Sequence, residues 1–302
     1  MISDKNKKWE IILTSYAKIN LTLDVGGLRP DGYHEIASVM QTITLADTLW
    51  FARIPSGIEV ISNNSEVPSG CANLAYRALE VIAHQLPGGV RVLIEKRIPW
   101  GAGLGGGSSN AAAALKGADL LYNCGMKEDD LLKAAAEVGS DVPFFIKGGT
   151  ALAEGRGERL TRLPQLPVFW VLLVKPPFTV STAKVYSLYQ SKGGEPHTPG
   201  LIAALQKGEH HKIPALLGND LEGVTVSLHP EIGEIKQQLL LLGAAAALMS
   251  GSGPTVFGLF HDQVAARQAA ERIRKKGGWD VFVCRTCSPP PDRRDDKEVF
   301  YG

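Results

Sequence analysis

The chain has 302 residues, of which 44% are hydrophobic and 21% are charged, an ordinary globular composition with enough length for two domains. Its 32 Lys and Arg residues against 31 Asp and Glu residues leave a net charge of +1, without the basic surplus typical of nucleic-acid-binding proteins. The longest apolar stretch, residues 239–249, is well short of the roughly 18 residues of a membrane span, and residues 1–10 are too polar for a signal peptide. We therefore expect a cytoplasmic protein that binds neither nucleic acid nor membranes.

The first hundred residues are rich in predicted strands. Short apolar runs, some of them alternating with polar residues, predict strands over residues 11–13, 17–25, 39–45, 48–53 and 58–62. Residues 26–35 are dense in turn formers and also carry polar and aromatic side chains. Residues 73–86 repeat apolar side chains at helical spacing, which predicts a helix.

The middle of the chain contains a glycine-rich loop between a strand and a helix. A strand over residues 90–98 leads into the loop, after which Ser108 or Ser109 is expected to cap an alanine-rich helix that ends at Tyr122. A second helix is predicted over residues 128–138, followed by strands within residues 148–174.

The second half alternates helices and strands. Helices are predicted over residues 201–206, 230–242 and 262–276, and strands over residues 246–249, 255–260 and 279–284. A Pro-containing segment at residues 160–167 suggests the domain boundary. We therefore expect an N-terminal domain over 1–165, a C-terminal domain over 166–288 and a charged, mobile tail over 289–302.

The strongest local signal is the glycine-rich segment at residues 99–110, PWGAGLGGGSSN. Glycines let the backbone approach a ligand closely and turn its N–H groups inward. The helix that follows adds a partial positive charge and unpaired N–H donors, so phosphate is the natural ligand. A tight turn would explain part of the pattern, but five glycines within residues 101–107 exceed what a turn requires.

Two familiar phosphate-binding motifs nearly fit this loop. Gly101, Gly103 and Gly106 satisfy G-x-G-x-x-G, and this pattern alone supports a nicotinamide-dependent oxidoreductase as one alternative. That fold also needs an acidic residue about 20 residues later at the end of a second strand, where residues 127–130 predict a loop and a helix start. The P-loop motif fails because Gly107 stands where its lysine should be. A bound nucleotide must therefore find its cation elsewhere.

Three segments, in the expected order, resemble motifs of the GHMP small-molecule kinases. They are residues 15–21 (SYAKINL), residues 99–115 and residues 250–254 (SGSGP). The resemblance implies an α+β, two-domain GHMP kinase fold, with an N-terminal half like ribosomal protein S5 domain 2 and a ferredoxin-like C-terminal α/β half. It also implies phosphate transfer from ATP, with Mg²⁺, to an alcohol. A non-enzymatic RNA-binding module is a further alternative by fold analogy, against which the near-neutral charge argues.

Within this family, residues 29–34 (RPDGYH) and 139–145 (GSDVPFF) are similar to those of members that phosphorylate the 2-hydroxyl of a cytidine diphosphate derivative of methylerythritol, in the non-mevalonate isoprenoid pathway. The resemblance implies that Asp141 is the general base and that Lys18 orients it and steadies the developing charge. Taken alone, Asp141 fits equally well as a helix N-cap, and Lys18 as a solvent-facing strand residue.

The same resemblance implies the ligand contacts. ATP is expected to contact Pro99, Gly101, Gly103, Leu104, Gly105, Gly106, Gly107, Ser108 and Ser109, with Lys96 and Asn73 on the adenosine side. The substrate is expected to contact Tyr33, His34 and Tyr186 through its base, together with Thr182 and, at the polyol, Asn20. Tyr186 fits simple packing as well. Ser108 is within expected reach of Mg²⁺, but no acidic cluster identifies a metal ligand, and the sequence leaves monomer and homodimer open.

Overall fold

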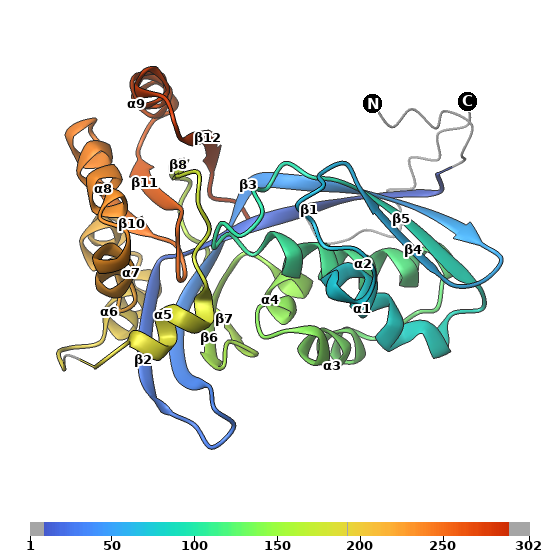
Figure 1. The fold of residues 1–302 in the computed structure, drawn as a ribbon. Coiled ribbons are helices and arrows are strands. Elements are labelled where there is room, and N and C mark those ends of the chain that lie inside the picture. Colours follow the sequence, from blue (N-terminus) through green and yellow to red (C-terminus); the bar gives the residue numbers. More distant parts are fainter. Residues whose placement is uncertain (1–8, 192, 290–302) are drawn as a thin grey trace.

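The computed structural model describes residues 9–191 and 193–289, which form two sheets with helices packed against them (Figure 1). The larger sheet comprises β1 (Ile11–Asn20), β2 (Thr22–Leu28), β3 (His34–Ile54), β4 (Ile58–Ser62), β5 (Gly89–Glu95), β6 (Thr150–Gly155), β7 (Arg159–Arg162) and β9 (Gly218–Asn219). The mixed α and β content and the two-part arrangement agree with the fold class predicted from the sequence.

The long strand β3 is the centre of the larger sheet, since β1, β2, β5 and β6 all pair with it. The prediction of separate strands over 39–45 and 48–53 was wrong, as was the break between 13 and 17 in β1. The pairing register between β1 and β3 shifts at Tyr16/Ala17 of β1. This irregularity interrupts the alternation of apolar and polar residues in β3 near Asp47. The strands nevertheless continue through this irregularity.

Four helices cover one face of the larger sheet: α1 (Leu74–Ile82), α2 (Gly106–Tyr122), α3 (Glu128–Val138) and α4 (Val142–Lys147) (Figure 1). The helix α2 is central, and a Cβ atom at Gly117 would lie only 2.2 Å from the ring of Phe51. The prediction that Ser108 or Ser109 caps α2 was wrong. The N-cap is Gly105, whose φ of 70° is in the left-handed region that glycine tolerates.

The smaller sheet has the strand order β10-β11-β8-β12, with all neighbours antiparallel. Its strands are β8 (Trp170–Lys175), β10 (Ala246–Met249), β11 (Val256–Phe260) and β12 (Asp280–Arg285), and α8 (Glu231–Leu241) and α9 (Gln263–Lys276) pack against it. The connections β8–α8–β10 and β11–α9–β12, with this strand order, match the ferredoxin-like arrangement expected for this half. The remaining helices are α5 (Thr182–Leu188), α6 (His197–Lys207) and α7 (Glu222–Leu228).

The two halves of the chain contribute to the same sheet and to the same hydrophobic core. The short strand β9 lies in the second half of the sequence but pairs in parallel with β2. One hydrophobic core contains residues of both halves, including Ile19, Val39, Val171 and Phe257. The expected tail over 289–302 lies outside the described residues except for Pro289. Among the described residues, no helix combines the length and the apolar character needed to cross a membrane.

Candidate active site

The two glycine-rich loops, far apart in the sequence, lie against each other. In the first loop, Gly101, Gly103 and Gly105 have φ values of +63°, +74° and +70°, which side chains disfavour. A Cβ atom at Gly103 would lie 2.5 Å from the carbonyl oxygen of Ser250 in the second loop. The Ser250 hydroxyl donates to the Gly103 carbonyl at 3.1 Å. This contact brings residues 250–254 into the site.

Lys18 and Asp141 form an ion pair beside the first loop. Lys18 Nζ lies 3.3 Å from Asp141 Oδ2, and the side chains are 5% and 33% exposed, respectively. The alternative of a solvent-facing Lys18 is therefore wrong, because the side chain is buried. Asp141 occupies the N-cap position of α4, but its side chain makes no capping hydrogen bond, so the N-cap alternative does not account for it. The buried cation instead meets a carboxylate that ligands can reach.

Asn20 holds Lys18 in place. Lys18 Nζ donates to Asn20 Oδ1 at 2.7 Å, and Asn20 Nδ2 donates to Ser38 Oγ at 2.8 Å. The loop passes close to the end of the same side chain, because a Cβ atom at Gly105 would lie 3.2 Å from Lys18 Cε. Lys18 thus lies between the glycine loop and Asp141.

Aromatic side chains gather around Tyr186, which lies within electrostatic reach of Asp141. The rings of His34 and Tyr186 are 5.7 Å apart, and His34 is 6.0 Å from Tyr189 in an edge-on arrangement. Burial, together with the charge of Asp141, raises the pKa of Tyr186 well above its usual range, so the phenol stays protonated. Tyr33 is 54% exposed on the neighbouring hairpin. Sequence reasoning missed Tyr189, whose spacing of three residues from Tyr186 was the available signal.

Several predicted ligand residues have side chains engaged in internal hydrogen bonds. Asn73 caps α1 through the N–H of Ala75 and donates to the Pro68 carbonyl. Ser109 is buried and donates to the Tyr16 carbonyl at 2.6 Å. Thr182 shares a hydrogen bond with Ser252, which links α5 to the second glycine loop.

Lys96 forms a buried ion pair that sequence reasoning did not foresee. Its Nζ lies 2.5 Å from Asp47 Oδ2 and donates to Asn110 Oδ1 at 3.3 Å. The ammonium group also lies at the start of α2, because a Cβ atom at Gly106 would be 3.0 Å from it. Its predicted contact with adenosine remains a prediction. Ser108, in the first turn of α2, is half-buried.

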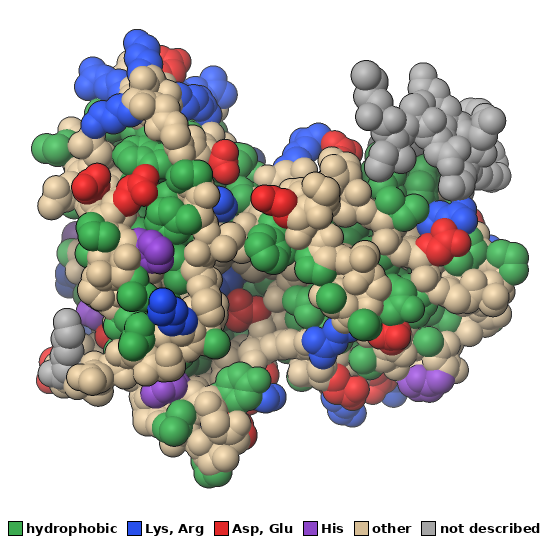
Figure 2. Space-filling view, in the orientation of Figure 1, with side chains coloured by type: hydrophobic (Ala, Val, Ile, Leu, Met, Phe, Trp, Pro, Cys, Tyr) green, Lys and Arg blue, Asp and Glu red, His purple; other side chains and the backbone are tan. Residues whose placement is uncertain are grey.

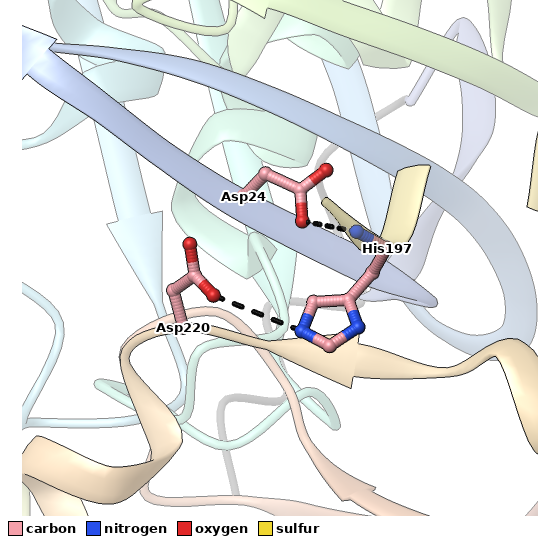
Figure 3. A group of neighbouring side chains, drawn as sticks. All are labelled: Asp24, His197 and Asp220. Carbon is pink, nitrogen blue, oxygen red and sulfur yellow. Dashed lines mark hydrogen bonds and ion pairs between the residues drawn. The ribbon is translucent and has the colours of Figure 1, made fainter. Parts of the chain in front are cut away.

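The structure brings together one group of potential metal ligands that the sequence did not reveal. Asp24 on β2, His197 at the start of α6 and Asp220 after β9 face one another (Figure 3). Asp24 already accepts the backbone N–H groups of His197 and Thr198, at 2.8 and 2.9 Å. Asp220 accepts the N–H of Val25 at 2.8 Å. We interpret this group as a structural link between the elements that carry it.

The surface is recessed between the two lobes of the molecule, with acidic and basic side chains visible inside the recess (Figure 2). A glycine loop at the start of a helix, a buried lysine and an accessible carboxylate are features that phosphoryl transfer to a hydroxyl requires. The nicotinamide alternative needs an acidic residue at the end of a second parallel strand, and residues 127–130 instead lead into α3. The arrangement therefore favours a kinase.

Comparison with known proteins agrees with this arrangement. Residues 73–149 match the model of the GHMP kinases N terminal domain, and residues 201–278 match that of the GHMP kinases C terminal domain. The 4-diphosphocytidyl-2-C-methyl-D-erythritol kinase of Pelotomaculum thermopropionicum is 49% identical over 90% of this chain and 96% of its own length. The kinase of the same name from Moorella thermoacetica is 47% identical over 88% of this chain and 95% of its own length.

A solved structure supports the same grouping. The crystal structure of a 4-(cytidine 5'-diphospho)-2C-methyl-D-erythritol kinase superposes with a TM-score of 0.79 and 36% identity, covering 92% of this chain and all of that chain. These matches extend across both halves of the fold and confirm the resemblance seen in the motifs. The chain therefore belongs to the GHMP kinases, among the 4-diphosphocytidyl-2-C-methyl-D-erythritol kinases, and is an ATP-dependent small-molecule kinase.

Proposed function

We propose that this chain transfers the γ-phosphate of ATP to the 2-hydroxyl of 4-diphosphocytidyl-2-C-methyl-D-erythritol, giving the 2-phosphate and ADP in the non-mevalonate pathway. The observation that carries the proposal is the Lys18–Asp141 pair, 3.3 Å apart, beside a glycine loop. Tyr186 lies within electrostatic reach of Asp141, and the ring of His34 is 5.7 Å from the ring of Tyr186. The loop suits ATP, the pair suits the reacting hydroxyl, and the aromatic rings suit the cytosine base.

Asp141 acts as the general base in this proposal. Its carboxylate accepts the proton of the 2-hydroxyl while the oxygen forms a bond to the γ-phosphorus and the bond to the ADP oxygen breaks. Lys18 orients the carboxylate and, because it also lies beneath the glycine loop, places a positive charge near the transferred phosphoryl group. Asn20 keeps Lys18 in this position, in addition to its expected contact with the polyol.

The residues at the glycine loop fit a magnesium ion that is held mainly by phosphate oxygens and water. Ser108, in the first turn of α2, offers a hydroxyl. Mg²⁺ commonly keeps several waters and takes only one or two protein oxygens beside substrate phosphates. When bound, it neutralises charge on the phosphates. Asp47 is not available for this purpose, because it is buried against Lys96.

The test is an ADP-release assay with ATP and Mg²⁺ that compares the cytidyl substrate with homoserine, mevalonate and galactose. Homoserine and mevalonate are necessary comparisons because kinases for both share this fold, with TM-scores of 0.71 and 0.72 at 19% and 16% identity. We expect turnover with the cytidyl substrate alone. Turnover with another acceptor would refute the proposed substrate, and no turnover with any of the four would refute the proposed reaction.

Replacing Tyr33 by Ala should weaken substrate binding more than it lowers turnover. The exposed ring is expected to stack on the cytosine base, and such stacking contributes about 1–3 kcal/mol, so KM should rise about 5- to 150-fold. Steady-state kinetics on the cytidyl substrate would measure this change, with Tyr33→Phe as a control that keeps the ring. An unchanged KM in Tyr33→Ala would contradict the stacking role.

A further inference from the structure

The turn between β6 and β7 touches both ends of the proposed substrate site. Arg156 lies in this turn, with its guanidinium carbon 5.1 Å from the centre of the Tyr33 ring. At the next residue, a Cβ atom on Gly157 would lie 3.7 Å from Asp141 Oδ1. The turn therefore reaches from the aromatic residue expected to stack on the base to the carboxylate expected to activate the hydroxyl.

Glu35 fixes this turn to the hairpin that carries Tyr33. Its Oε1 accepts the Gly155 N–H at 3.1 Å and lies 2.9 Å from Nη2 of Arg159. Its Oε2 lies 2.5 Å from Nη1 of Arg29. Arg29 and Arg159 are thus both paired with Glu35, and the position of the turn is set by hydrogen bonds on both sides.

Arg156 differs from these two arginines in its surroundings. Within residues 9–191 and 193–289, no carboxylate lies within 4.0 Å of its guanidinium, and its close neighbour is the face of the Tyr33 ring. Burial raises the pKa of Asp31, but the Tyr33 N–H and Arg29, and to a smaller extent the charge of Arg156, lower it further than burial raises it. Arg156 is half-buried as a residue, and a guanidinium over an aromatic ring without a carboxylate partner is free to pair with an anion.

We propose that Arg156 binds the diphosphate of the substrate and so makes the site specific for a nucleoside diphosphate derivative. This inference rests on the proposed function. The substrate has a base at one end, a polyol at the other and a diphosphate between them, and Arg156 lies on the turn that spans the corresponding parts of the site. A guanidinium matches phosphate oxygens with two parallel hydrogen bonds, which a neutral side chain does not replace.

The first test compares the binding of CDP and cytidine, with ADP present at saturation to occupy the ATP site. Calorimetric titration would use the wild type, Arg156→Gln and the matched control Arg162→Gln, which removes the same charge from an exposed position on β7. We expect Arg156→Gln to weaken CDP binding about 10- to 100-fold, as for a hydrogen-bonded ion pair, and cytidine binding less than twofold. Arg162→Gln should match the wild type. Equal losses for CDP and cytidine, or no loss for CDP, would overturn the proposal.

Kinetic measurements distinguish two roles of Arg156: direct contact with the diphosphate, and an indirect role in which it only holds the Tyr33 ring in position. Arg156→Gln should raise KM for the cytidyl substrate by a similar factor, with kcat changed less than threefold, and Arg156→Lys should recover part of the loss. In a Tyr33→Ala background, Arg156→Gln should still raise KM, whereas a role that acts only through the ring would have no further effect.

The failure of the Arg156 proposal can be told apart from the failure of the proposed function. If the wild type turns over this substrate and Arg156→Gln has an unchanged KM, only the Arg156 proposal fails. If the wild type does not turn it over, the proposed function fails, and the comparison of CDP with cytidine still decides whether Arg156 binds a diphosphate.

Discussion

Replacing Asp141 by Asn should lower turnover about 10²- to 10⁴-fold, the contribution of a well-placed general base. Asn has almost the same shape and can still accept a hydrogen bond from Lys18, but its amide oxygen takes up a proton far less readily than a carboxylate. The fold and ATP binding should therefore survive, since Asp141 makes no capping hydrogen bond to α4. The measurement is kcat for the cytidyl substrate, together with ATP affinity and the free energy of unfolding.

The matched control is Asp129→Asn, which removes an exposed carboxylate from the first turn of α3. This variant should keep kcat close to that of the wild type. A decrease of less than threefold in Asp141→Asn would remove Asp141 from the role of base. A large decrease that is accompanied by unfolding would point to a structural role instead.

Replacing Asp47 by Ala should reduce the free energy of unfolding by about 3–5 kcal/mol, as for other buried ion pairs that lose one partner. Asp47 is fully buried, and the side chain of Lys96 is 4% exposed. The carboxylate accepts the N–H groups of Arg97 and Ile98, at 2.7 and 2.8 Å, as well as hydrogen bonds from Lys96 and Asn110. Its loss leaves the buried ammonium group of Lys96 without its anionic partner, and the N–H groups of Arg97 and Ile98 without their acceptor. Urea unfolding monitored by circular dichroism would measure the change.

The double variant Asp47→Ala/Lys96→Met tests the cause of this loss. Removing the unpaired ammonium group should recover part of the stability, because the uncompensated charge is the largest part of the cost. The same variants should weaken ATP binding, since Asp47 fastens the segment before the glycine loop to Asn110 on α2. A loss of stability below about 1 kcal/mol in Asp47→Ala would show that water or another group replaces the carboxylate.

Elements with strong local signals were predicted closely. The helix α3 and the strands β4 and β10 have the predicted bounds, because their apolar periodicity and flanking turn residues are contained within a few residues of sequence. The helix α4 was not predicted as a helix, since its six residues are too few to show a period, although Asp141-Val142-Pro143 is a recognisable helix start. The continuous β3 was also missed, because different partners pair with its two ends and change the pattern along it.

The sequence by itself determined the chemistry available to this protein: a glycine loop for phosphate, an aromatic hairpin, and the identities of Lys18 and Asp141 within recognisable motifs. The tertiary structure decided which of these groups meet. It placed Lys18 beside Asp141, Ser250 against Gly103, Tyr186 near the same carboxylate, and Lys96 on Asp47. Each of these contacts joins residues that are distant in the chain. Their distances depend on strand register and on the packing of helices against the sheets, which no local pattern of residues encodes.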